Sequence, residues 1–190
     1  MCNVIVPFVV GGGRIMNEKD SKGLIHVYTG NGKGKTTTAL GLVARRVGLG
    51  KEAVVIQFVK GDKQCGEHYF SDRTHSFKII QPSKVSSFSG SQYEIHRAVL
   101  DTLAIADSIL TSGEYDLVVL DEVLTALHKR LLSLRQVVEL IEKKPEDVEL
   151  VLTGRGALED IIRRADIVTE MMVVKHPYEK GMPARKGIEY

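Results

Sequence analysis

Short apolar segments alternate with longer amphipathic ones from residue 24 to residue 174. The short segments predict strands over 24–29, 53–58, 77–80, 117–121, 149–153 and 167–174. Several are apolar at consecutive positions, which is typical of strands that are covered on both faces. Strands that alternate with helices form βαβ units, so the pattern predicts an α/β fold with a mainly parallel sheet and helices on both faces.

The longer segments between these strands show helical spacing. Over 93–110 the apolar residues recur every three or four positions, which predicts a helix with one buried face. A second helix is predicted over 134–143, where Ser133 and Gln136 can form a capping box and Pro145 follows the end. The serine-rich stretch 81–92 predicts a surface loop, and 175–190 predicts an extended segment over the surface.

One domain is expected from residue 23 to residue 190. The chain has 190 residues and a 43% hydrophobic content, enough for a single core, and shows no repeat or linker. The apolar run 4–10 is interrupted by Pro7 and lacks the basic flank of a signal peptide. Residues 1–22 are instead expected to be a disordered leader, and residues 1–15 could alternatively lie upstream of a true start at Met16. A chain that begins at Met16 is expected to keep its stability and activity.

Composition excludes several classes of function. Lys and Arg number 26 against 24 Asp and Glu, so no basic field predicts binding to nucleic acid. The apolar runs are shorter than the roughly 20 residues that span a membrane, and two cysteines cannot build a disulfide framework. We therefore expect a cytoplasmic protein. Cys65, His68 and His75 offer only half of a metal site.

The strongest motif follows the first strand and opens a helix. It consists of Thr29, Gly30, Asn31, Gly32, Lys33, Gly34, Lys35, Thr36 and Thr37. The glycines let backbone amides converge, and a helix N-terminus adds positive potential, so the segment predicts a phosphate loop. Lys35 is expected to contact phosphate oxygens, and Thr36 to bind Mg²⁺. The usual pattern has glycine at position 29, so this loop is shortened and is expected to hold phosphates differently from an ordinary P-loop ATPase.

Acidic residues end another predicted strand. Asp121 and Glu122 follow the apolar run 117–120, where a nucleotide-binding sheet holds Mg²⁺ opposite the phosphate loop. Alternatively, Asp121 caps the helix predicted over 123–129. A further strand ends at Thr153 and is followed by Arg155, which we include among the expected ATP contacts. These ends are predicted to share the carboxyl edge of the sheet, where doubly wound folds bind ligands.

With these motifs in this order, the chain resembles the ATP:cob(I)alamin adenosyltransferases of the P-loop type. The resemblance covers the sequence from about residue 23 to the C-terminus. The shortened phosphate loop, which departs from the ordinary pattern, fits this family residue for residue. The matching stretches are 30–37, 55–61, 120–125, 151–156, 174–176 and 187–190.

The resemblance implies transfer of the 5′-deoxyadenosyl group of ATP to the reduced cobalt of a corrinoid, with release of triphosphate. Attack at ribose C5′ makes the phosphate loop a binder of the leaving group, and ATP in such proteins lies reversed relative to ordinary P-loop enzymes. The amides of residues 30–34, with Lys33 and Lys35, would bind the polyphosphate, while Thr36 and Glu122, with Asp121, would hold Mg²⁺. No general base is required. The resemblance also implies a homodimer and an electron donor such as a reduced flavoprotein.

No catalytic role is expected for the histidines. His128 and His176 are assigned to structural or surface positions by default, because the implied reaction needs no proton transfer to or from a side chain.

One departure from the family lies between residues 60 and 93. Members often carry a Gly-Phe-Thr-Trp stretch there that contacts the corrin, but this chain has no tryptophan. Phe88 is the nearest candidate for a corrinoid contact, and it could also be an ordinary hydrophobic anchor for its loop. A relative that has lost the corrinoid and kept ATP is the other interpretation of this departure.

Two rival functions stay open on the sequence alone. One is a P-loop ATPase or phosphotransferase, which would release ADP. The other is a nucleotide-dependent module that binds a corrinoid and delivers it to a partner enzyme.

Overall fold

The computed structural model describes residues 22–60, 65–81, 90–177 and 181–189. Most of the leader and Phe88 lie outside these ranges. The elements in chain order are β1 (Ile25–Thr29), α1 (Lys35–Gly48), β2 (Ala53–Gln57), α2 (Gly66–Thr74), β3 (Lys78–Ile80), α3 (Gln92–Leu110), β4 (Leu117–Asp121), α4 (Val123–His128), α5 (Leu134–Glu142), β5 (Glu149–Thr153), α6 (Glu159–Ile162) and β6 (Ile167–Glu170). The predicted strands are confirmed, although β6 ends four residues earlier than expected, and α2 was not predicted.

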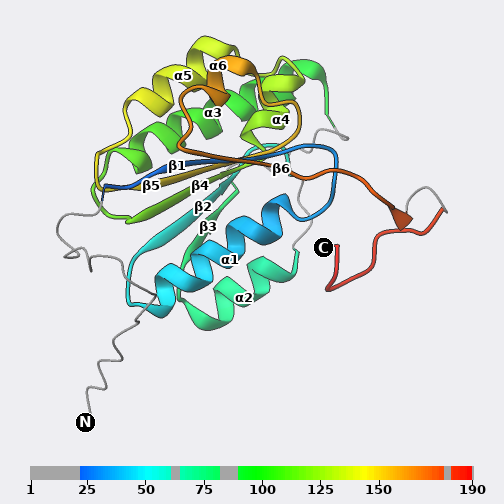
Figure 1. Ribbon diagram of the computed structural model, residues 1–190, viewed down its shortest axis with the longest axis horizontal. Coiled ribbons are helices and arrows are strands. Elements are labelled where there is room, and N and C mark those ends of the chain that lie inside the picture. The colour runs from blue at the N-terminus through cyan, green and yellow to red at the C-terminus, as the bar shows by residue number, and fades with distance from the viewer. Residues whose placement is uncertain (1–21, 61–64, 82–89, 178–180, 190) are drawn as a thin grey trace, which may run out of the picture.

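The six strands form one sheet in the order β3-β2-β4-β5-β1-β6, and every pairing between them is parallel. Helices α1 and α2 cover one face, and α3, α4, α5 and α6 cover the other (Figure 1). This arrangement confirms the predicted α/β fold with a parallel sheet between two helical layers.

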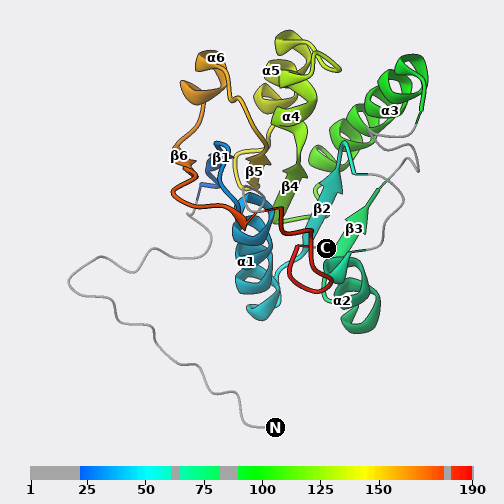
Figure 2. The same cartoon turned by 90° about the vertical axis from the view of Figure 1, so that its right-hand side faces the viewer.

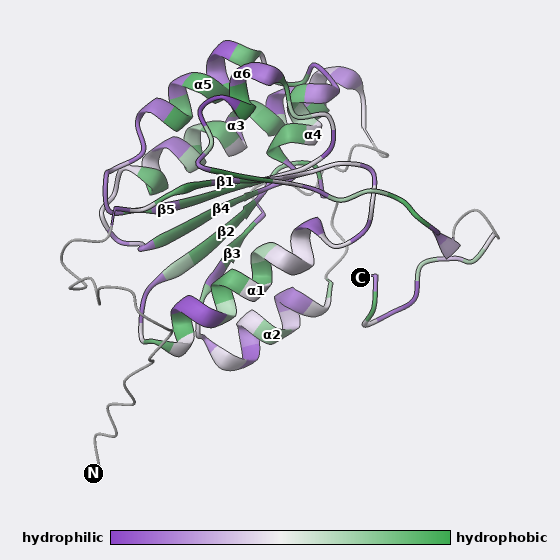
Figure 3. Cartoon of the chain, in the orientation of Figure 1, coloured by the Kyte–Doolittle hydropathy of each residue, from purple (hydrophilic) through white to green (hydrophobic). Residues whose placement is uncertain are grey.

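Successive strand residues bury their side chains in different layers. In β4, Leu117 and Val119 pack in the cluster with α1, while Val118 and Leu120 pack in the larger cluster under α3 and α5. The strands are therefore apolar at consecutive positions, as the hydropathy colouring shows (Figure 3). Strands β1 to β5 each contribute to both hydrophobic cores, whereas the edge strand β6 is exposed along its length.

Capping boxes set the start of two helices on the larger core. The Ser133 hydroxyl accepts a hydrogen bond from the Gln136 amide, and the Gln136 side chain accepts one from the Ser133 amide at 2.8 Å, as predicted. Ser91 and Glu94 form the same motif at the start of α3. Both motifs satisfy amide groups that have no partner within the helix.

At the amino edge of the sheet, Glu149 joins β5 to β1. Its carboxylate accepts the Leu24 amide at 3.1 Å and contacts the His26 ring. Burial alone would raise the pKa of Glu149, but these hydrogen bonds outweigh burial and hold the pKa below its usual value. The contact fastens the two strands at the end away from the phosphate loop.

The opposite, carboxyl edge collects polar residues from neighbouring strands. The strand order places the ends of β2, β4, β5 and β1 side by side, at Gln57, Asp121, Thr153 and Thr29. Figure 2 views this edge, with the C-terminal segment crossing it in front of α1 and β2. The residues that carry chemistry are thus brought together by topology.

Within the described ranges, no helix has both the length and the apolar character needed to cross a bilayer.

Candidate nucleotide and magnesium site

The phosphate loop joins β1 to α1 and packs against the chain that follows β6. Gly30 and Gly34 have φ angles of 95° and 117°, a left-handed conformation that glycine adopts readily. A Cβ on Gly30 would lie 2.5 Å from the Met171 carbonyl oxygen. Glycine at position 30 is therefore required by both the backbone conformation and the close approach of a second segment.

The start of α1 leaves backbone amides without a hydrogen-bond partner in the described part of the chain. The first helical hydrogen bond runs from the Thr38 amide to the Gly34 carbonyl at 2.8 Å, and Gly34 provides no side-chain cap. The amides of Lys35, Thr36 and Thr37 precede this bond, so they are available to an anion. The Gly32 amide was expected to bind polyphosphate, but it donates a hydrogen bond to the Met171 carbonyl at 2.6 Å.

Lys35 lies inside the loop. Its side chain is buried, and Nζ donates to the carbonyl oxygens of Gly30 at 2.8 Å and Gly32 at 2.7 Å. Burial lowers the pKa of the Lys35 ammonium, although the nearby acids oppose this effect. The cation is held beside the free amides of α1, where it can exchange carbonyl partners for phosphate oxygens.

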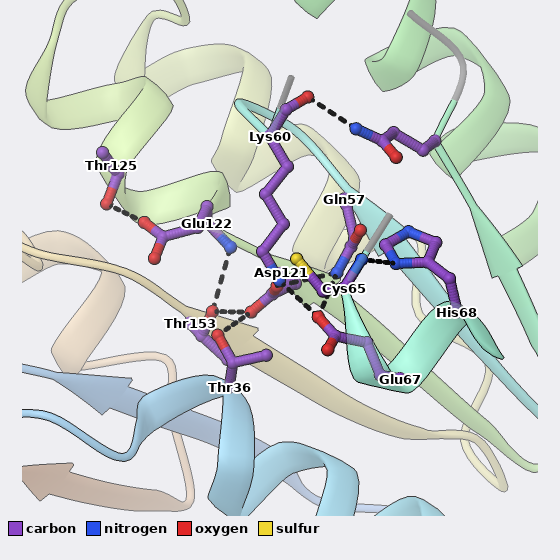
Figure 4. Close-up of polar contacts among 11 residues, drawn as sticks. Thr36, Gln57, Lys60, Cys65, Glu67, His68, Asp121, Glu122, Thr125 and Thr153 are labelled. Atoms are coloured by element: carbon purple, nitrogen blue, oxygen red, sulfur yellow. Dashed lines mark hydrogen bonds and ion pairs between the residues drawn. The ribbon is translucent and has the colours of Figure 1, made fainter. Parts of the chain in front are cut away.

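Asp121, at the end of β4, is the centre of a polar network (Figure 4). The side chain has 0% exposure. Oδ1 accepts hydrogen bonds from the hydroxyls of Thr36 at 2.8 Å and Thr153 at 2.7 Å, and Oδ2 accepts one from Gln57 Nε2 at 3.3 Å. Asp121 therefore does not cap α4, because its carboxylate faces the phosphate loop; the N-cap position is Glu122.

Lys60 supplies the charge that balances Asp121. Its Nζ lies 3.3 Å from Asp121 Oδ2 and 2.7 Å from Glu67 Oε1, in the first turn of α2. Burial would lower the pKa of Lys60, but the two carboxylates outweigh it and raise the pKa. Conversely, burial would raise the pKa of Glu67, and Lys60 lowers it. The cation joins α2 to the centre of the site.

Glu122 is the more accessible of the two acids. Its residue has a φ of 63°, and its amide donates to the Thr153 hydroxyl at 2.9 Å. Its carboxylate accepts a hydrogen bond from the Thr125 hydroxyl. The side chain is only partly buried and borders the cavities described below, whereas both oxygens of Asp121 are already occupied.

Two adjoining cavities open on this edge, and they share walls at Thr36, Thr37, Glu122, Ile188 and Glu189. The smaller has a volume of about 320 Å³ and is lined mainly by the phosphate loop, with Arg155 and His176 opposite. The larger has a volume of about 490 Å³, lies against α1 and α2, and has a partly apolar wall from Leu40, Ala44, Phe70 and Phe77. The site thus combines a polar cavity at the phosphate loop with a less polar neighbouring cavity.

Several of these residues were not predicted as site residues. Thr153, Gln57 and Lys60 end or follow apolar strands, so the position of each was a usable signal. Glu67 depends on α2, and Glu189 on a contact 156 residues along the chain. His176, assigned to the surface by default, borders the phosphate cavity.

Two of the three residues that the sequence offered as half of a metal site, Cys65 and His68, lie close together. The ligand atoms of Cys65, Glu67 and His68 lie within 4.8 Å of one another, and His75 is not part of that group. Glu67 already pairs with Lys60, and His68 Nδ1 accepts the Cys65 amide at 3.1 Å. An ammonium beside the carboxylate opposes binding of a second cation.

Known proteins are similar to this sequence over nearly its whole length. The family model described as ATP:corrinoid adenosyltransferase BtuR/CobO/CobP matches residues 21–190. The chain is 37% identical over 180 residues to the corrinoid adenosyltransferase of Pseudomonas aeruginosa, covering 93% of this chain and 88% of the relative. It is 34% identical over 186 residues to that of Escherichia coli K12, covering 93% and 90%.

A third relative, the corrinoid adenosyltransferase CobA of Salmonella typhimurium, is 35% identical over 186 residues, covering 93% of this chain and 90% of the relative. Among solved structures, C. elegans PCH-2 is 19% identical with a TM-score of 0.39, covering 77% of this chain and 35% of that chain. From the match over residues 21–190 and these identities, the chain belongs to the ATP:corrinoid adenosyltransferase family.

Proposed function

We propose that this protein transfers the 5′-deoxyadenosyl group of ATP to the reduced cobalt of a corrinoid and releases triphosphate. The observation that carries the proposal is the shortened phosphate loop, with unpaired helix amides and buried Lys35, opening beside a second and less polar cavity. Family membership supplies the reaction class. The two cavities suit this reaction because the polyphosphate and the reacting ribose carbon must be held at separate positions.

The polyphosphate is the leaving group in this reaction. Cobalt(I) attacks ribose C5′ with its own electron pair, the C5′–O bond breaks, and that bond pair leaves with triphosphate. The protein must align the two reactants and stabilise the charge on the departing group. We assign the second task to Lys35, Lys33, Arg155 and the amides at the start of α1.

We assign Mg²⁺ to the hydroxyl of Thr36 and the carboxylate of Glu122. Hydroxyl and carboxylate oxygens suit this ion, whose charge would offset that of the polyphosphate. Asp121 would orient Thr36 through the 2.8 Å hydrogen bond and would not itself contact the ion, because both its oxygens have protein partners.

We assign the adenosine part of ATP to the larger cavity, where Phe70 and Phe77 provide apolar surface and the shared wall at Thr36 leads to the phosphate pocket. Phe88 stays our candidate for a corrinoid contact. A homodimer, a reduced flavoprotein as electron donor and a cytoplasmic location complete the proposal, and the resemblance to the family supports them.

An anaerobic assay with chemically reduced cobalamin, ATP and Mg²⁺ tests the function. We expect the absorption of the cobalt to change to that of an adenosylated corrinoid, only when ATP is present. Lys35→Ala should lower the rate by at least about 100-fold, because it removes a cation from the leaving-group site. ATP hydrolysis without corrinoid would favour the ATPase, and binding of adenosylcobalamin without its synthesis would favour the delivery module.

A further inference from the structure

The C-terminal segment places a carboxylate on the phosphate loop. Residues 181–189 cross the carboxyl edge of the sheet (Figure 2), and Glu189 Oε1 lies 2.7 Å from Lys33 Nζ. The Glu189 carboxylate also accepts the Arg185 amide at 2.7 Å and the Arg185 guanidinium at 3.0 Å. Glu189 and Ile188 border both cavities.

The groups around Glu189 are those that hold phosphate oxygens in proteins. An ammonium, a guanidinium and a backbone amide converge on one carboxylate, and the ammonium belongs to the phosphate loop itself. Hydrogen bonds from Arg185 and then Lys33 lower the pKa of Glu189 to about 2. The carboxylate is therefore an anion at any pH used for an assay. It pairs with Lys33, which we assign to the polyphosphate in the proposed function.

We propose that Glu189 competes with the polyphosphate for Lys33 and so sets the affinity of the phosphate loop for ATP and for the product triphosphate. This inference rests on the proposed function, because it takes the loop as the polyphosphate site. Triphosphate carries several negative charges and would leave the loop slowly. A carboxylate that can take over Lys33 weakens the hold on the product as well as on the substrate.

The contact has the properties of one that a ligand can displace. Residues 181–189 are exposed, the Lys33 side chain keeps 45% exposure, and the Glu189 side chain keeps 21%. Ion pairs at such positions contribute little to stability. Polyphosphate, which carries more charge than one carboxylate and also meets Lys35 and the amides of α1, can therefore replace Glu189 on Lys33.

Calorimetry with inorganic triphosphate and Mg²⁺ tests the competition without the adenosyl transfer reaction. Glu189→Gln keeps the size of the side chain and removes its charge, so we expect triphosphate to bind about fivefold more tightly than to the wild type. Glu139→Gln is the matched control, because Glu139 also pairs with an arginine four residues away, at 2.6 Å, but on α5. The affinity of Glu139→Gln for triphosphate should stay within about twofold of that of the wild type.

A second background shows whether the effect passes through Lys33. In Lys33→Met, the further change Glu189→Gln should alter the affinity by less than about twofold, because the carboxylate has lost its partner on the loop. Equal or weaker binding by Glu189→Gln, or an undiminished gain in the Lys33→Met background, would overturn the inference and leave the proposed function intact. Absence of triphosphate binding to the wild type would overturn both.

Discussion

Asp121 is the residue on which the site converges. Its carboxylate has 0% exposure and meets groups from α1, β5, β2 and the connection that follows β2. A buried carboxylate is tolerated only when each oxygen has donors and the charge has a partner. Here the hydroxyls of Thr36 and Thr153 satisfy one oxygen, and Gln57 and Lys60 satisfy the other. The same residue thus stabilises the fold and fixes the predicted Mg²⁺ ligand Thr36.

Replacing Asp121 by Asn should reduce stability strongly. The amide nitrogen would face groups that donate, and Lys60 would lose one of its two counter-charges, so we expect the free energy of unfolding to fall by about 2–4 kcal/mol. Urea denaturation measures the change. The control Asp107→Asn removes an exposed pair with Lys143 and should cost less than about 1 kcal/mol. Similar losses in the two variants would contradict the central place of Asp121.

At the scale of elements, the sequence predicted what local pattern determines. Continuous apolar runs that end in polar residues located the strands and the carboxyl edge, including Asp121 and Arg155. Helix α2 escaped prediction because Tyr69 and Phe70 are 44% and 52% exposed, so its apolar residues do not form a buried face. The ion pair between Glu67 and Lys60 and a hydrogen bond from Ser71 Oγ to the Phe77 carbonyl at 2.7 Å hold it instead. The C-terminal contact with the phosphate loop likewise depends on tertiary structure that no local pattern encodes.

The contact between the phosphate loop and the chain after β6 predicts a contrast between two glycines. Gly30 and Gly50 both have positive φ angles, 95° and 73°, but a Cβ on Gly50 would meet nothing within 4 Å. Gly50→Ala should cost about 1 kcal/mol for its backbone conformation. Gly30→Ala should cost at least about 1 kcal/mol more, since the loop must also move away from Met171, and it should abolish triphosphate binding.

Chemical denaturation and calorimetry on the two glycine variants measure these effects. If Gly30→Ala were as stable as Gly50→Ala and bound triphosphate normally, the approach of the Met171 carbonyl would not constrain the loop.

The link between β1 and β5 predicts a pH dependence of stability. The pKa of Glu149 is lowered in the folded chain from its ordinary 4.5. Its contribution is therefore present above pH 4.5 and is lost as the pH falls through the folded-state value. Glu149→Gln should reduce the free energy of unfolding at pH 7 by about 1–2 kcal/mol and have less effect below the folded-state pKa. A difference from the wild type that stays constant with pH, measured by urea denaturation, would contradict this role.

For the whole molecule, the fold fixes where the polar residues of the site lie, and in the proposed function the phosphate loop binds the leaving group. A parallel sheet covered on both faces brings the ends of β1, β4 and β5 to one edge, and many nucleotide-binding proteins share that arrangement. Membership of the ATP:corrinoid adenosyltransferase family distinguishes this chain from other P-loop proteins. The physical consequence is that the loop should retain three linked phosphates while carbon departs from them.

Phosphorus NMR of the products formed from ATP and chemically reduced cobalamin tests this claim most directly. We expect one intact triphosphate for each corrinoid adenosylated, because the bond that breaks joins C5′ to oxygen and every P–O–P linkage survives in the enzyme-bound product. The appearance of ADP with inorganic phosphate, or of AMP with pyrophosphate, in proportion to turnover would mean that the loop directs attack at phosphorus, and would contradict the account.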